Sequence, residues 1–165
     1  MRKLAAKIRV GLGYDSHRFA EDARKLVLGG VEFPGEKGLK GHSDADVLIH
    51  AVIDALLGAA ALGDIGSHFP DTDEKWRGAD SAQLLKAVVS EVRAAGYEIG
   101  NIDATVICER PRIGGKVMEI RARLAGIMEI DVAAVGVKGK TNEGMDDIGA
   151  GAGIAVHAVC LLTAG

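Results

Sequence analysis

The sequence contains few aromatic residues and few cysteines, and both shortages restrict the kind of protein it encodes. Aromatic residues make up 4% of the 165 residues, whereas 48% are hydrophobic and 23 are glycine. The core must therefore consist mainly of small aliphatic side chains. The two cysteines, Cys108 and Cys160, each lie in an apolar run typical of a strand. This placement favours buried, reduced thiols and a reducing cytoplasm over a disulfide.

Long apolar runs and clustered charge are also missing. No uncharged segment approaches the roughly 18 residues that a membrane-spanning helix needs, and Lys7 and Arg9 interrupt the apolar core of a signal peptide. The net charge is −3, and the basic residues are scattered. We therefore predict a soluble, cytoplasmic protein with no nucleic-acid partner and no membrane partner. The mean hydropathy of +0.15 is high for so small a chain and predicts that other subunits cover part of its surface.

Hydrophobic periodicity divides the chain into short strands and three helices. The length fits a single domain, residues 1–165, with residues 1–8 as an N-terminal extension. The expected strands cover residues 8–15, 97–109, 132–138 and 154–162, with a hairpin over 26–34, and the expected helices cover 43–62, 81–96 and 116–126. We expect a polar turn at 15–19, a long loop at 63–80 that has a function beyond connecting two helices, and a glycine-rich loop at 139–153. This order predicts an α+β fold, a two-layer α/β sandwich with one mixed sheet and helices on one face.

The helix expected over residues 43–62 carries the first indication of function. Ser43 is a suitable N-cap, and Asp46 can reach back to it in a weak capping box. Asp46, His50 and Asp54 are spaced at i, i+4 and i+8, so they share one stripe of an otherwise apolar helix. Burying such a stripe is costly unless its groups pair with each other or bind a ligand.

A candidate metal site combines this helix with the end of the first strand. Asp15 and His17 are two residues apart, so both side chains point to the same face of a strand, and His50 can supply a third ligand. Two imidazoles and one carboxylate with an open position are a common arrangement for a catalytic zinc. Taken singly, the residues also fit plainer roles: Asp15 and His17 can be turn residues, and His50 can be a structural histidine.

Two segments are candidates for phosphate binding. His42 and Ser43 stand at the expected helix start, where free N–H groups and the helix dipole favour an anion, although an ordinary cap is the alternative. The segment GVKGKT at 136–141 is too short between its glycines for a Walker A loop. Four residues here can contact phosphate or a second cation, or can be solvated loop residues: Lys138, Lys140, Thr141 and Glu143. His68 and His157 look structural, in a loop and in a buried strand respectively.

Four motifs occur together in this chain: GYDSHRF at 13–19, the long block at 41–73, GADS at 78–81 and TNEG at 141–144. Together they resemble the 2-C-methyl-D-erythritol 2,4-cyclodiphosphate synthase family, and the resemblance extends from Val10 to Leu162. It implies cyclisation of 4-diphosphocytidyl-2-C-methyl-D-erythritol 2-phosphate with release of CMP, in the non-mevalonate route to isoprenoid precursors. It also implies a homotrimer with active sites between subunits, in which mixed four-stranded sheets face the three-fold axis and each subunit adds a small β-hairpin.

The resemblance also assigns roles to residues. It implies zinc on Asp15, His17 and His50, and a second divalent cation, magnesium, on Glu143 with the substrate diphosphate. His42 and Thr141 are the catalytic residues that it implies. Within one subunit, the resemblance implies substrate contacts for Asp15, Ser16, His17, His42 and Ser43, for Asp64, Ile65 and Gly66 at the methylerythritol part, and for Phe69, Pro70, Asp71, Thr72 and Asp73 along the site. From the neighbouring subunit, it implies contacts around the cytidine for Cys108, Glu109, Arg110, Pro111, Arg112, Ile113 and Gly114. The same neighbouring subunit is implied to contact the diphosphate through Lys140, Thr141, Asn142 and Glu143.

Several positions depart from the family pattern, namely Arg112, Lys140, Asp147 and, most of all, residues 149–153. Residues 149–153 read GAGAG where the family usually reads GRGEG, which removes an arginine and a glutamate near the three-fold axis. Relatives have a cavity there that can take an isoprenoid diphosphate, and we expect no such ligand in this chain. Two other functions stay open: a zinc-dependent phosphodiesterase that uses the same metal site on water, and an inactive nucleotide-binding trimer.

Overall fold

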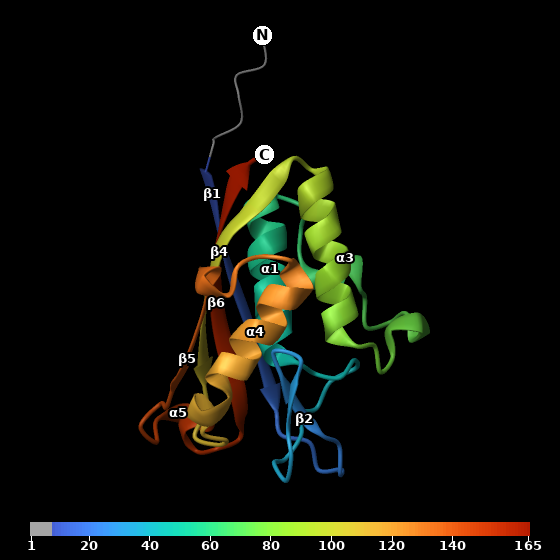
Figure 1. Ribbon diagram of the computed structural model, residues 1–165. Coiled ribbons are helices and arrows are strands. Elements are labelled where there is room, and N and C mark those ends of the chain that lie inside the picture. Colours follow the sequence, from blue (N-terminus) through green and yellow to red (C-terminus); the bar gives the residue numbers. More distant parts are fainter. Residues whose placement is uncertain (1–7) are drawn as a thin grey trace.

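The computed structural model describes residues 8–165, and Figure 1 shows the order of its helices and strands. The elements are β1 (Ile8–Arg18), β2 (Leu26–Leu28), β3 (Val31–Phe33), α1 (Val47–Ala60), α2 (Ile65–His68), the 3₁₀ helix η1 (Glu74–Trp76), α3 (Ser81–Ala94), β4 (Tyr97–Ile107), the 3₁₀ helix η2 (Ile113–Lys116), α4 (Val117–Met128), the 3₁₀ helix η3 (Val132–Ala134), β5 (Val135–Lys140), α5 (Asp146–Gly149) and β6 (Gly153–Ala164). The expected N-terminal extension falls outside the described residues except for Ile8, which begins β1.

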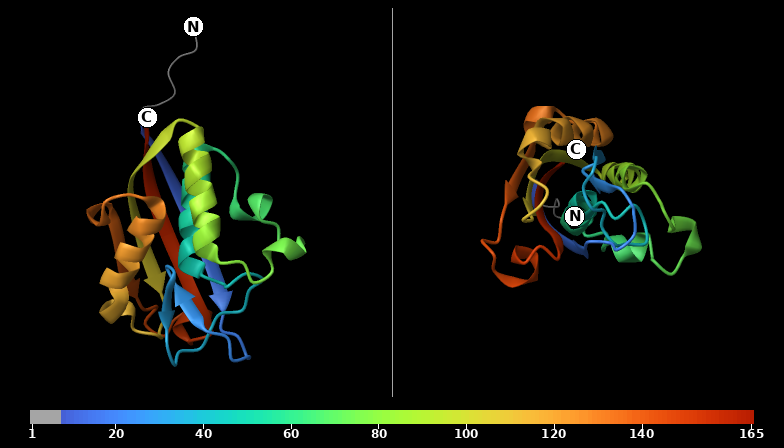
Figure 2. Two further views of the ribbon diagram at one scale, coloured as in Figure 1. Left: turned by 45° about the vertical axis from the view of Figure 1, so that its right-hand side comes forward. Right: turned by 90° about the horizontal axis from the view of Figure 1, so that it is seen from below.

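A mixed four-stranded sheet forms one layer of the fold. Its strand order is β1–β6–β4–β5, in which β6 runs antiparallel to β1 and β4, and β5 runs parallel to β4. The β2–β3 hairpin is a separate two-stranded sheet, and its turn residues Gly29 and Gly30 both have positive φ, which glycine adopts without strain. Figures 1 and 2 show α1, α3 and α4 on one face of the large sheet. The predicted α+β architecture with a mixed sheet is therefore confirmed.

Helix α1 lies directly on the backbone of β1 because the facing side chains are absent or small. A Cβ atom added at Gly13 would lie 1.8 Å from the carbonyl oxygen of Ala51, and one at Gly11 would lie 1.9 Å from that of Ala55 and 2.8 Å from the Cβ of Ala59. We call these five residues the glycine–alanine seam. Any larger side chain on the strand would force the helix away from the sheet.

The seam also fixes the register between helix and strand. Four helical residues advance about 6 Å and two strand residues about 6.6 Å, so every second residue of β1 meets every fourth residue of α1. The next residues on this face of β1 are Asp15 and His17, which therefore lie at the N-terminal end of α1. His50 leans toward them because helical side chains tilt toward the N-terminus of their helix.

The core consists of aliphatic side chains, as the composition predicted. All residues of α1 except Asp54 and Gly58 are buried, and Cys108 and Cys160 are buried free thiols. The largest fully buried side chains are leucines and isoleucines: Leu26, Leu28, Leu39, Leu48, Ile49, Ile53, Leu56, Leu57, Leu85, Ile102, Ile120 and Leu124. Every helix within residues 8–165 is too short or too polar to cross a membrane.

The face of the sheet that points away from α1 carries exposed apolar side chains. Ile8, Val10, Leu12 and Tyr14 of β1 are each more than half exposed, and Val159 of β6 pairs with Leu12. Figure 2 shows the helices on the opposite side of these strands. This surface agrees with the high mean hydropathy of the chain.

Several strand predictions are wrong. β1 continues through the expected polar turn at 15–19 as far as Arg18, because residues 15–18 pair with residues 153–156 of β6. Residues 132–134 form η3, so β5 begins only at Val135. His157 is exposed beside Tyr14 rather than buried, since it lies on the outer face of β6.

Asp46 is the N-cap of α1, so the prediction of a helix that starts at Ser43 is wrong. The Asp46 Oδ1 atom accepts hydrogen bonds from the N–H groups of Ile49 at 3.0 Å and Gly29 at 2.9 Å, and Oδ2 accepts one from Gly30 at 2.7 Å. Burial raises the pKa of the Asp46 carboxyl to about 6, while these N–H donors act in the opposite direction. At neutral pH the ionised carboxylate thus ties the hairpin turn to the start of α1.

Replacing Gly13 with alanine should destabilise the protein, because the new Cβ meets the backbone of α1 rather than a movable side chain. We expect the free energy of unfolding to fall by about 3 kcal/mol, at the upper end of the usual range for overpacking. Urea unfolding followed by circular dichroism measures this change. The control is Gly58→Ala, which adds the same methyl group to α1 with no atom within 4 Å and should stabilise the helix by about 0.5–1 kcal/mol. Equal effects of the two substitutions would contradict the seam.

Candidate functional site

A cavity of about 460 Å³ opens where β1 meets the N-terminal end of α1. This volume is in the range that binds small molecules. The cavity brings together ten of the predicted site residues: Asp15, His17, His42, Ser43, His50, Ile65, Gly66, Phe69, Pro70 and Asp71. Its wall also includes Gly41, Trp76 and Leu84, which the sequence did not point to.

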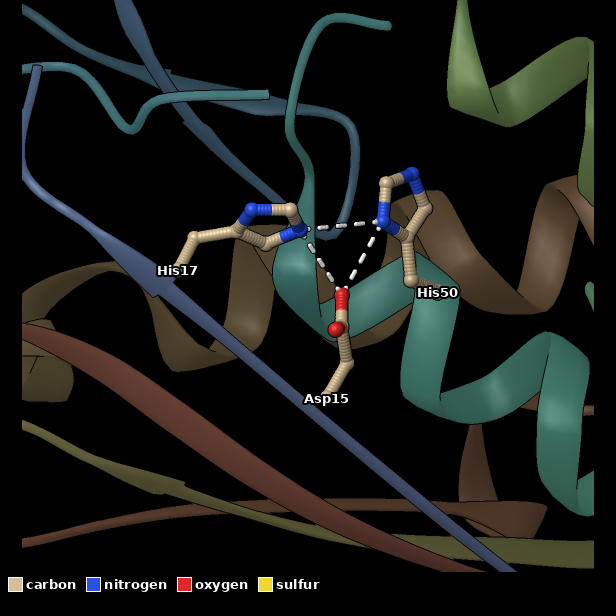
Figure 3. Close-up of side chains that lie close together, drawn as sticks. All are labelled: Asp15, His17 and His50. Carbon is tan, nitrogen blue, oxygen red and sulfur yellow. Dashed lines mark hydrogen bonds and ion pairs between the residues drawn. The ribbon is translucent and has the colours of Figure 1, made fainter. Parts of the chain in front are cut away.

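Asp15, His17 and His50 form a compact group of three potential metal ligands. The Asp15 Oδ2 atom lies 2.9 Å from His17 Nε2 and 3.0 Å from His50 Nδ1, and the two ring nitrogens are 3.4 Å apart. Figure 3 shows the two imidazoles from β1 and α1 pointing at the carboxylate between them. The side chains are 26%, 20% and 11% exposed respectively, so the group is open to the cavity on one side only.

A hydrogen bond of His17 Nδ1 leaves the other ring nitrogen, Nε2, free to bind a metal ion in this group. Its Nδ1 atom is 2.7 Å from the carbonyl oxygen of Lys40. A carbonyl only accepts, so in the neutral ring Nδ1 carries the hydrogen and Nε2 is unprotonated. His17 therefore presents a free nitrogen to Asp15 and His50, which is the form that binds metal.

The electrostatics of the group favour a bound positive charge. Burial raises the pKa of Asp15, but hydrogen bonds with His17 and His50 outweigh it and bring the pKa down to about 2. Burial lowers the pKa of His17, whereas its hydrogen bond and charge attraction with Asp15 raise it above its usual value. Protons and a divalent cation compete for the same three atoms. The group can therefore hold one divalent metal ion, with one side open to a ligand.

His42 and Ser43 line the cavity, but not at a helix start. α1 begins at Val47, and the carboxylate of Asp46 already accepts the N–H of Ile49, so the predicted anion seat at a free helix N-terminus is wrong. Ser43 Oγ lies 3.2 Å from His50 Nε2. His42 Nε2 is buried with no hydrogen-bond partner among residues 8–165, so this atom is not committed to another group.

The long loop at 63–80 forms one wall of the cavity. Asp54 of α1 accepts a hydrogen bond from the N–H of Ile65 at 2.7 Å, which anchors α2 to α1. The ring of Phe69 packs edge-on against that of Trp76, with centroids 4.9 Å apart. The loop is therefore folded onto the site rather than extended, although Asp64, Thr72 and Asp73 do not line the cavity.

The remaining predicted residues gather at the other edge of the sheet. Residues 108–114 follow β4, and residues 141–143 follow β5. The two segments contact each other, since the N–H of Asn142 donates to Glu109 Oε1 at 3.0 Å. Within the second segment, the hydroxyl of Thr141 donates to Glu143 at 2.9 Å. One strand, β6, lies between β1 and β4, and two strands lie between β1 and β5, and none of these residues lines the cavity of the Asp15–His17–His50 group.

Two predicted residues cannot contact this cavity through their side chains. Ser16 lies on the face of β1 opposite to Asp15 and His17 and lines a neighbouring hollow with Arg18 and Asp147. The Cys108 thiol is buried, which raises its pKa to about 11 and makes it a poor nucleophile.

Sequence reasoning missed Ser81, whose Oγ lies 2.9 Å from His50 Nε2, and Asp44, which accepts hydrogen bonds from Ser81. Ser81 was recognised only as a helix start, and Asp44 was not singled out. The GADS motif that ends at Ser81 was the available signal, but a motif does not show which side chain it meets.

The fold and the cavity define an α+β protein with a candidate divalent-metal group at the wall of a small-molecule-sized site. A family model described as the YgbB family matches residues 8–163, and the chain belongs to this family.

The relatives agree with this assignment. The 2-C-methyl-D-erythritol 2,4-cyclodiphosphate synthase of Brachyspira hyodysenteriae is 56% identical over 155 residues, which cover 94% of this chain and 98% of that protein. The protein of the same name from Alkaliphilus oremlandii is 53% identical over 152 residues, covering 92% and 96%. Among solved structures, the CDP complex of IspF from Plasmodium falciparum superposes with a TM-score of 0.85 at 32% identity, covering 98% of this chain and 99% of that one.

Substituting the metal ligands should remove a bound divalent ion without unfolding the chain. We expect Asp15→Ala, His17→Ala and His50→Ala each to weaken zinc binding by about 100-fold or more, since each removes one of three ligands. Zinc titration against a chromophoric chelator measures the affinity, and circular dichroism checks the fold. His157→Ala is the control, because His157 lies on the outer face of the sheet. Unchanged zinc affinity in His50→Ala would contradict the ligand assignment.

Proposed function

We propose that this chain catalyses the cyclisation of 4-diphosphocytidyl-2-C-methyl-D-erythritol 2-phosphate to 2-C-methyl-D-erythritol 2,4-cyclodiphosphate with release of CMP. The chain is then a phosphorus–oxygen lyase of the non-mevalonate route to isoprenoid precursors. Membership of the YgbB family and the names of the relatives support this function. The observation that carries it is the three-ligand group at the cavity wall, because a cation there can neutralise substrate phosphate.

Zinc is the metal that the donor set favours. Two imidazole nitrogens and one carboxylate oxygen with an open side match the usual ligands of a catalytic zinc. Asp15, His17 and His50 would hold the ion, and bound zinc supplies a Lewis acid that polarises a phosphoryl oxygen. We assign the second cation to Glu143 and identify it as magnesium, since magnesium prefers carboxylate and phosphate oxygens.

The reaction needs no nucleophile from the protein. An oxygen of the 2-phosphate attacks the β-phosphorus of the same molecule, and a new P–O bond closes the ring. The P–O bond to CMP breaks, and CMP leaves with the electron pair. A cavity that holds the substrate in a folded pose removes much of the entropic barrier. We assign His42 of one copy and Thr141 of a neighbouring copy to stabilise the transferring phosphoryl group through hydrogen bonds.

The two clusters of site residues join only if they come from different copies of the chain. β1 and β5 are the opposite edges of the sheet, with β6 and β4 between them, so they are roughly 14 Å apart at the usual strand spacing. A head-to-tail contact would place residues 140–143 and 108–114 of one copy against the metal group of the next. Such head-to-tail contacts close into a ring when the rotation that relates neighbouring copies closes, as a three-fold rotation does. A trimer with its sheets toward the three-fold axis also covers the exposed apolar residues of β1.

A product assay tests the function against its two alternatives. The wild-type chain should release one CMP per cyclic diphosphate and incorporate no oxygen from labelled water, as mass spectrometry would show. Thr141→Ala should lower kcat by about 100-fold with little change in KM, because it removes a hydrogen bond made mainly in the transition state. Labelled oxygen in the product would favour a phosphodiesterase, and binding of CDP without turnover would favour an inactive nucleotide-binding protein.

Mixed assemblies test whether each site is shared between copies. His50→Ala and Thr141→Ala should each retain about 1% of wild-type activity or less alone. Their co-expressed mixture should recover about a quarter of wild-type activity, because about one contact in four joins two intact halves. The matched control pairs His50→Ala with Asp15→Ala, which damage the same half and should recover nothing. Absence of recovery in the first mixture would show that the site lies within one chain.

A further inference from the structure

We propose that Asp44 and Ser81 are positioning residues that fix the tautomer of His50. Neither residue belongs to the cavity wall, and neither touches Asp15 or His17 in the described contacts. The inference rests on the metal site of the proposed function, because the tautomer decides whether His50 can be a ligand.

The hydrogen bonds around Ser81 have a single consistent direction. Asp44 Oδ2 accepts the backbone N–H of Ser81 at 3.0 Å, and Asp44 Oδ1 accepts the Ser81 hydroxyl. A carboxylate only accepts, so the hydroxyl proton of Ser81 points at Asp44. Ser81 Oγ, fully buried and 2.9 Å from His50 Nε2, is then left as an acceptor. His50 must donate through Nε2–H.

The hydrogen on Nε2 of His50 determines the state of the second ring nitrogen, Nδ1. With hydrogen on Nε2, the neutral imidazole of His50 has a lone pair on Nδ1. That atom is the one that faces Asp15 Oδ2 and His17 Nε2. Hydrogen-bond partners behind a histidine commonly set its tautomer and raise its affinity for metal. Asp44 and Ser81 thus prepare His50 for a cation without contacting it.

The backbone holds Asp44 in this role. The N–H of Asp44 donates to the carbonyl of Ala79 at 3.1 Å, and Asp44 Oδ1 also accepts the N–H of Asp46 at 3.1 Å. Ala45 has φ 58°, a left-handed conformation that is unfavourable for alanine. Strained residues of this kind persist where the surroundings fix them, often near functional sites.

Asp44→Asn should reverse the direction of these hydrogen bonds. In the orientation that keeps the amide oxygen on the N–H of Ser81, the amide nitrogen donates to Ser81 Oγ, and the N–H of Asp46 loses its acceptor. The Ser81 hydroxyl would donate to His50 Nε2, and the hydrogen of the neutral ring would move to Nδ1, where it blocks metal binding. We expect zinc affinity to fall by about 10–100-fold.

The tautomer of His50 is the property that would not change if Asp44 had only a structural role. Nitrogen-15 NMR of the histidine rings in the metal-free protein at alkaline pH should show His50 as Nε2–H in the wild type and as Nδ1–H in Asp44→Asn. The matched control is Asp80→Asn, which makes the same change at the N-cap of α3, one residue before Ser81. It should leave both the tautomer and the zinc affinity unchanged.

A second variant covers the case in which Asp44→Asn does not fold. Ser43 Oγ lies 3.2 Å from the same His50 nitrogen and can replace Ser81 as acceptor, so both hydroxyls are removed in Ser43→Ala/Ser81→Ala. This variant should also bind zinc about 10-fold or more weakly. Wild-type tautomer and affinity in both variants, or an equal loss in Asp80→Asn, would overturn the proposal. Absence of zinc binding by the wild type would instead contradict the proposed function, while the tautomer measurement would still test Asp44 and Ser81.

Discussion

The contact between α1 and the backbone of β1 determines where the rest of the molecule lies. Without side chains at Gly11 and Gly13, the helix rests on the strand itself, and the distance between helix and sheet is as short as packing allows. The separation of Asp15 Oδ2 from His50 Nδ1, 3.0 Å, follows directly from this approach. The residues that pack the core therefore also set the geometry of the three-ligand group.

Three acidic residues, one buried and two half-buried, connect the surrounding elements to that contact. Asp46 joins the β2–β3 turn to α1, Asp44 joins α3 to α1, and Asp54 joins α2 to α1. Each carboxylate accepts backbone N–H groups, which is the condition under which such groups can be buried at tolerable cost. The cavity lies where these elements meet, so hydrogen bonds to α1 and to the residues just before it hold its walls, together with the packing of Phe69 on Trp76.

The parts of the structure that depend on local pattern could be predicted from the sequence. The helices, the hairpin turn at Gly29 and Gly30 and the shared face of Asp15 and His17 follow from periodicity, and the aliphatic core follows from composition. The start of α1 could not be predicted, because Ser43 and Asp46 are both good caps and only the distant turn N–H groups decide between them. The continuation of β1 depends on pairing with β6. The role of Ser81 depends on the carboxylate of Asp44, which is 37 residues away in the sequence. The separation of the three-ligand group from residues 108–114 and 141–143 depends on strand order, which hydrophobic periodicity does not predict.

The scarcity of aromatic residues has an optical consequence. Trp76 is the only tryptophan of the chain, and it stands in the cavity wall against Phe69. Light absorbed at about 295 nm, among the longest wavelengths that the protein absorbs, is therefore taken up by one indole. The fluorescence that follows originates in the wall of the cavity that also contains the three-ligand group. Indole emission responds to the polarity of its surroundings, so occupancy of the cavity is reported by the unlabelled protein itself.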